Sequence, residues 1–78
     1  MVRKGRAKAT WNARKVRSLR RHLGSTQQEM AETLGTRQQT ISEWETGMYR
    51  PRGTSRTLLQ IVAERADFKY EAKPSAGG

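Results

Sequence analysis

The stretch from Thr26 to Gly47 carries two short helical signals in succession, and this spacing limits the folds open to the chain more than any other feature. Thr26 with Glu29 can form a capping box, in which the hydroxyl and the carboxylate each satisfy a free amide at a helix start. Thr36 with Gln39 repeats that pattern directly after Gly35, a residue suited to ending a helix. Helices of about eight to ten residues do not persist alone in water. The chain must therefore pack several short helices together.

Helical patterns also flank this stretch. Residues 11–22 are predicted to form a helix, capped by Thr10 and ended by Gly24. Its apolar face consists of Val16, Leu19 and Leu23. A last helix is expected to begin at Thr54 or Ser55. Its inward positions follow the helical period at Leu58, Ile61, Val62, Arg65 and Ala66, and Leu59 and Ala63 widen that face.

With 78 residues, the chain has room for one domain. No segment shows the alternation typical of strands. We therefore expect an all-α fold, a compact domain of four or five helices over residues 10–70. A flexible basic arm at 1–9 is expected to precede it, and a flexible tail at 71–78 to follow it.

Positive charge is concentrated at the start of the chain. The formal net charge is +9, and residues 1–21 hold nine Lys or Arg residues and no acid. Acidic and basic residues balance in the remainder. A one-sided excess of this kind suits a polyanionic partner and predicts salt-sensitive binding. The alternative is a solvated basic tail.

The composition leaves little scope for catalysis or metal binding. The chain has no cysteine, and His22 is its one histidine. We expect no metal site and no cofactor, and no enzymatic activity, because no nucleophile can be matched with a base. No apolar run approaches the roughly 18 residues of a membrane span, so we expect a cytoplasmic protein without a membrane partner.

Two short helices joined by a tight turn are the layout of a helix-turn-helix unit, whose second helix enters the DNA major groove. Ala31, Gly35 and Ile41 supply a small residue at the helix crossing, a glycine at the turn and an inward β-branched residue. The string TQQEMAETLG–TRQQTISEWETG resembles the phage-repressor and Cro-type (XRE-like) helix-turn-helix family over about residues 13–66. The resemblance implies a repressor-like fold and sequence-specific DNA binding, usually as a dimer.

The front of the second helix is expected to read bases. By the resemblance, Gln38 and Gln39 match glutamines that reach base edges, and a glutamine amide can bond N6 and N7 of adenine together. Arg37 is expected to bind a guanine or a phosphate. Thr40 is expected to touch a thymine methyl or to pack, and Ser42 to make a small polar contact. The alternative for Gln39 is the capping box with Thr36.

Other residues are expected to hold the DNA backbone, which positions a protein without reading sequence. The expected phosphate contacts are Gln27, Gln28, Thr36, Arg50 and Arg52. Those of the amino-terminal arm are Arg3, Lys4, Arg6 and Lys8, unless the arm is only a solubility tail.

A third group is expected to build the unit rather than to bind with it: Arg20, Ala31, Gly35, Ile41, Trp44 and Glu45. The resemblance implies that Arg20 pairs with Glu45. Trp44 follows Ile41 at the inward spacing, which favours the core over base stacking. Glu43 would be repelled by phosphate, so we expect its side chain to point away from the DNA-facing side.

Together these features predict a transcriptional regulator that acts as a repressor. It is expected to bind double-stranded DNA at a palindromic operator as a homodimer, and to be associated with the nucleoid when bound. One alternative is an antitoxin with a toxin partner, because RPRGTSRTLLQIVAERADF resembles the fourth helix of helix-turn-helix antitoxins. A less favoured alternative is a small basic RNA-binding protein, since Trp11 and Trp44 are expected to face inward.

Overall fold

The computed structural model describes residues 11–69, and within this range it contains four helices and no strand. They are α1 (Ala13–Leu23), α2 (Gln27–Leu34), α3 (Gln38–Thr46) and α4 (Thr54–Arg65). The all-α prediction is therefore confirmed. The predicted arm at 1–9, the predicted cap Thr10 and the tail at 71–78 lie outside the described residues.

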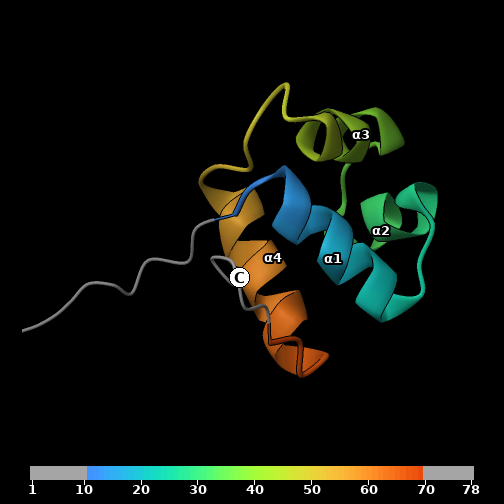
Figure 1. Cartoon of the computed structure of the whole chain (residues 1–78), viewed down its shortest axis with the longest axis vertical. Coiled ribbons are helices and arrows are strands. Elements are labelled where there is room, and N and C mark those ends of the chain that lie inside the picture. Colours follow the sequence, from blue (N-terminus) through green and yellow to red (C-terminus); the bar gives the residue numbers. More distant parts are fainter. Residues whose placement is uncertain (1–10, 70–78) are drawn as a thin grey trace, which may run out of the picture.

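The helices pack around one small core. α2 and α3 pack closely on each other, α1 contacts α3, and α4 contacts α2. Figure 1 shows α1 between α4 and the α2–α3 pair. The buried apolar residues are Trp11, Val16, Leu19, Met30, Ala31, Leu34, Ile41, Trp44, Leu59 and Ala63. Since every helix contributes to this cluster, the core compensates for helices that are too short to be stable alone.

The start of α1 differs from the prediction. Asn12, and not Thr10, caps the helix, and its side-chain oxygen accepts a hydrogen bond from the amide of Lys15 at 2.9 Å. The reason is the burial of Trp11, whose indole nitrogen donates to the side-chain oxygen of Gln60 at 3.3 Å. Because Trp11 is docked on α4, the chain enters α1 two residues later than the apolar pattern indicates.

The start of α2 follows the predicted capping box. Thr26 Oγ1 accepts from the amide of Glu29 at 3.0 Å, and the Glu29 carboxylate accepts from the amide of Thr26 at 2.9 Å. Gly35 ends α2 in the left-handed conformation, with φ of 71°. Since φ is positive there, a residue without a Cβ is favoured at the turn.

The start of α3 does not follow its predicted cap. The amide of Thr36 donates to the carbonyl of Ala31 at 2.8 Å, so Thr36 belongs to the closing turn of α2. Arg37 takes the cap position with no side-chain cap bond, and α3 begins at Gln38. The alternative of a capping box between Thr36 and Gln39 is therefore wrong.

α4 is rotated relative to the predicted inward face. Leu59 and Ala63 are buried, whereas Leu58 and Ile61 are 36% and 41% exposed. Five apolar residues between positions 58 and 63 fit more than one helical face, so periodicity alone left the rotation of α4 undetermined. Packing against Trp11 and α2 decides it, and apolar side chains remain on the outer side of α4.

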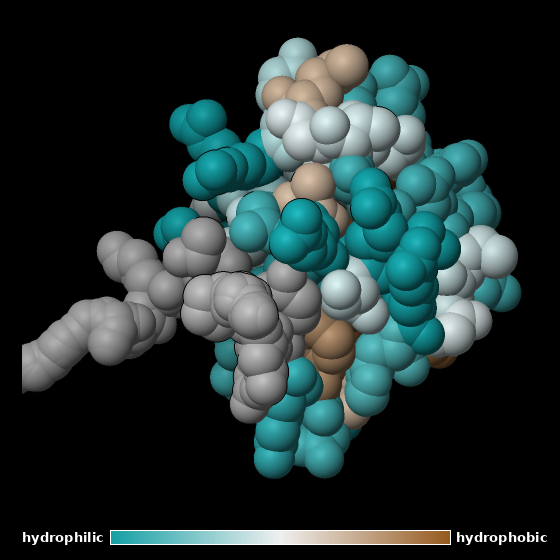
Figure 2. Space-filling model, in the orientation of Figure 1, coloured by the Kyte–Doolittle hydropathy of each residue, from teal (hydrophilic) through white to brown (hydrophobic). Residues whose placement is uncertain are grey.

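The surface is mainly hydrophilic. Figure 2 shows hydrophilic residues over most of one face, with small separate hydrophobic areas between them. Among residues 11–69, no helix has both the length and the apolar character that a membrane span requires.

Candidate nucleic-acid interface

One side of α3 is fixed in the core and the opposite side faces solvent. Ile41, Trp44 and Glu45 are buried, and Trp44 is only 5% exposed. A side chain this deeply buried is not available to stack on a base, so Trp44 belongs to the core as predicted. Gln38 and Gln39 are exposed on the other side, and Ser42 and Glu43 are half-buried.

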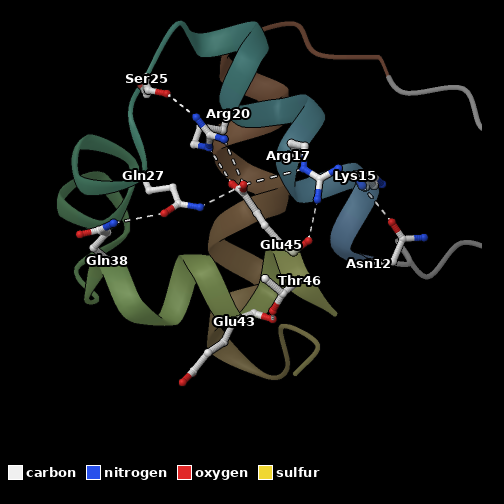
Figure 3. Close-up of polar contacts among 10 residues, drawn as sticks. All are labelled: Asn12, Lys15, Arg17, Arg20, Ser25, Gln27, Gln38, Glu43, Glu45 and Thr46. Atoms are coloured by element: carbon white, nitrogen blue, oxygen red, sulfur yellow. Dashed lines mark hydrogen bonds and ion pairs between the residues drawn. The ribbon is translucent and has the colours of Figure 1, made fainter. Parts of the chain in front are cut away.

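Glu45 is the buried anion that joins α3 to α1. Arg20 donates from Nε to Glu45 Oε2 at 2.7 Å and from Nη2 to Glu45 Oε1 at 3.0 Å. Arg17 donates to the Glu45 backbone carbonyl at 2.8 Å, and its Nε lies 4.0 Å from the carboxylate. Figure 3 shows these groups converging on Glu45 from α1. The pair that the resemblance implied is present, whereas the contact from Arg17 was not anticipated.

The charged form of Glu45 is stabilised by its partners. Burial by itself would raise the pKa of Glu45, but hydrogen bonds from Arg20 and Gln27 and the charges of Arg20 and Arg17 outweigh it. The pKa of Glu45 is accordingly lowered from its ordinary value. Glu45 is therefore an ionised structural group that faces away from the exposed side of α3.

A chain of hydrogen bonds continues from Glu45 to the exposed front of α3. Gln27 Nε2 donates to Glu45 Oε1 at 3.2 Å, and Gln27 Oε1 accepts from Gln38 Nε2 at 3.2 Å. Figure 3 shows Gln27 between the other two residues. Since both ends of the Gln27 amide are engaged, its orientation is fixed. The amide of Gln38 is in turn held at the front of α3.

The other predicted base-reading residues lie beside Gln38. Arg37 and Gln39 are exposed, and Thr40 is half-buried next to the buried Ile41. The structure therefore brings all five predicted residues to the first two turns of α3 or to its cap, with Ser42 the furthest along the helix.

The predicted phosphate-binding residues fall into two groups. Gln27, Gln28 and Thr36 lie at the two ends of α2, and the Gln28 amide donates to Glu32 at 3.1 Å. Arg50 and Arg52 are exposed in the loop after α3, on either side of the buried Pro51. The predicted arm residues Arg3, Lys4, Arg6 and Lys8 lie outside the described range.

Glu43 lies beside Gln39 on the solvent-facing side of α3. Its carboxylate accepts a hydrogen bond from Gln39 Nε2 at 3.1 Å, so it shares the solvent-facing side of α3 with a predicted base-reading residue. The expectation that Glu43 points away from the DNA-facing side is therefore incompatible with base reading by Gln39, and both stay predictions. The i, i+4 spacing of Gln39 and Glu43 was the sequence signal that indicates such a contact.

No group of three or more His, Cys, Asp or Glu side chains within residues 11–69 could hold a metal ion. Comparison with known proteins identifies one relationship. A profile of the Helix-turn-helix family matches residues 16–64, which extend from the first turn of α1 into the last turn of α4. No curated protein and no solved structure matches the chain significantly.

Proposed function

The chain belongs to the XRE-like helix-turn-helix family of DNA-binding regulators, and from this membership we propose that it is a sequence-specific repressor that reads the DNA major groove with α3. The observation that carries the proposal is the two-sided character of α3. Its inner side is held by Ile41, Trp44 and Glu45, and its outer side presents Gln38 and Gln39. A rigidly supported helix with exposed amides is suited to reading base edges.

The exposed amides define the proposed base contacts. A glutamine that donates to N7 and accepts from N6 recognises adenine through two hydrogen bonds. Gln38 is well suited to this contact because Gln27 restrains its amide at 3.2 Å. Three further residues make supporting contacts. Arg37 binds a guanine or a phosphate, Thr40 touches a thymine methyl, and Ser42 contacts a base or the DNA backbone.

The proposed backbone contacts lie on both sides of α3. Gln27, Gln28 and Thr36 bind phosphate from the α2 side, and Arg50 and Arg52 bind it from the loop after α3. The burial of Pro51 between the two arginines supports this role, because it anchors the loop while both cations remain exposed. Contacts of this type set the register of α3 in the groove.

Long-range attraction comes from the cations of residues 1–21, which we propose bring the protein to DNA before α3 docks. The amino-terminal arm, with Arg3, Lys4, Arg6 and Lys8, is the part of this segment proposed to contact the duplex directly. Repression then follows from occupation of promoter DNA.

We propose that the regulator acts as a homodimer that meets through the outer side of α4. Leu58 and Ile61 leave apolar surface exposed there. Two copies related by a two-fold axis across this side bring the Leu58 and Ile61 of one copy against those of the other. Such self-complementarity is what a two-fold contact requires.

The test is selection of bound sequences from random DNA duplexes at a stated salt concentration. A palindromic consensus is expected, and binding without sequence preference would refute the proposal. Sedimentation of Ile61→Glu beside the wild type tests the dimer, since the change should leave a monomer. Copurification with a small partner protein from the native host would instead favour the antitoxin alternative.

A further inference from the structure

A glutamine–glutamate pair lies on the solvent-facing side of α3. Gln39 Nε2 donates to Glu43 Oε2 at 3.1 Å, one helical turn further along. Pairs with the same spacing and the same 3.1 Å bond occur in α2, between Gln28 and Glu32, and in α4, between Gln60 and Glu64. The pair in α3 differs from these two because its helix also carries Gln38 at the proposed DNA surface.

The bond to Glu43 determines which way the Gln39 amide faces. A glutamine amide has two N–H donors and one oxygen acceptor, and its two ends can exchange by rotation. A carboxylate accepts hydrogen bonds and does not donate them, so it selects the orientation with the nitrogen toward Glu43. The Gln39 oxygen and its second N–H remain available, and these are the groups that bind N6 and N7 of adenine.

The carboxylate of Glu43 has no cation to neutralise it within residues 11–69. The ion pairs of that range involve Glu45 and Asp67, and the side-chain partner of Glu43 is the neutral Gln39. Figure 3 shows Glu43 on the side of α3 away from Arg20 and Arg17. An uncompensated carboxylate close to DNA weakens binding unless a base donates a hydrogen bond to it.

The major groove offers such a donor only on some bases. Cytosine N4 and adenine N6 are amines, whereas guanine presents the acceptors N7 and O6, and thymine presents O4. A carboxylate facing guanine therefore brings acceptors together, and one facing cytosine accepts a hydrogen bond. Glu43 thus distinguishes bases by rejection as well as by attraction.

We propose that Gln39 and Glu43 act as one reading unit, in which Glu43 orients the Gln39 amide and selects an amine-bearing base, cytosine foremost, at the base pair that it faces. The inference rests on the proposed base reading by α3. It assigns Glu43 a role in specificity and predicts one position of the binding site that excludes guanine opposite this residue.

The experiment compares duplex selection by the wild type with selection by Glu43→Gln, Glu32→Gln and Glu64→Gln. Each variant removes one negative charge by replacing a carboxylate that accepts a 3.1 Å hydrogen bond from a glutamine with an amide of similar size. Glu43→Gln should abolish the amine preference at one position per half-site, with a loss of about tenfold in discrimination against guanine. The two control variants should keep the wild-type consensus.

A second variant tests the coupling within the unit. Gln39→Ala should weaken the preference at the neighbouring base pair, and the double variant Gln39→Ala with Glu43→Gln should lose less than the two single losses combined. A Glu43→Gln consensus identical to that of the wild type would overturn the reading unit and leave the proposed function intact. A wild type that selects no consensus would instead overturn the proposed function itself.

Discussion

The guanidinium of Arg20 donates two hydrogen bonds to the carboxylate of Glu45, at 2.7 and 3.0 Å, and thereby joins α1 to the buried side of α3. The same carboxylate binds Gln27, which binds Gln38. The orientation of the exposed Gln38 side chain at the proposed DNA surface therefore depends, through Gln27, on the ion pair between Arg20 and Glu45.

Stability should fall in acid because of Glu45. The folded protein lowers the pKa of Glu45 below its ordinary value of 4.5. A depressed pKa adds stability that is complete above the ordinary value and is lost as the pH falls through the lowered value. Urea unfolding measured from neutral pH to about pH 3 should show this loss. Glu45→Gln should show a shallower dependence on pH than the wild type, and equal slopes for the two proteins would contradict the assignment.

Removing either member of the buried pair should be costly. Arg20→Ala leaves Glu45, which is 4% exposed, without its main partner, and we expect a loss of about 3 kcal/mol in the free energy of unfolding. This value is at the lower end for buried pairs because the Arg20 side chain is itself 21% exposed. The double variant Arg20→Met with Glu45→Met should lose less than the single variants Arg20→Met and Glu45→Met combined. Additive losses in denaturant unfolding would argue against a direct interaction.

Gln27→Ala should change DNA recognition more than stability. The substitution frees the Gln38 amide and removes one hydrogen bond to Glu45, worth about 1 kcal/mol. We expect weaker preference at the base pair read by Gln38, measured by competition between the selected site and single-base variants. Gln28→Ala is the control, since Gln28 contacts Glu32 and not α3. The network has no role in recognition if both variants discriminate equally well.

Gln38→Ala and Arg52→Ala should separate base reading from backbone binding. The first should reduce discrimination at one base pair by about 1–3 kcal/mol. The second should weaken binding to all duplexes alike and reduce the slope of log affinity against log salt by about 0.9. Titrations of selected and random duplexes at several salt concentrations measure both effects. Uniform weakening by both variants would refute this division of roles.

Gly35→Ala should destabilise the turn through backbone strain alone. Gly35 has φ of 71°, and a Cβ added there meets no atom within 4 Å. We expect a loss of about 1 kcal/mol, and a smaller loss for Gly35→Asn because asparagine tolerates the left-handed conformation better. Thermal unfolding of both variants measures the difference. If Gly35→Asn were the less stable of the two, the conformational explanation would be wrong.

Local features of the chain could be predicted well because neighbouring residues satisfy them. The capping box of Thr26 and Glu29 and the turn at Gly35 depend on residues five or fewer positions apart. The inward positions of α3, Ile41 and Trp44, follow from one short period with few alternatives. The Arg20–Glu45 pair spans 25 residues, and only the resemblance to a family indicated it.

The sequence by itself determined that short helices must pack into an all-α fold and that Gln38 and Gln39 lie near the start of one of them. Only the tertiary structure decided the cap at Asn12, the start of α3 at Gln38 and the rotation of α4. The physical reason is that each of these depends on a choice among locally similar options. Docking of Trp11 on α4 and packing of α4 against α2 make that choice for α1 and α4 through contacts between distant parts of the chain. The bond from the Thr36 amide to the Ala31 carbonyl makes it for the start of α3.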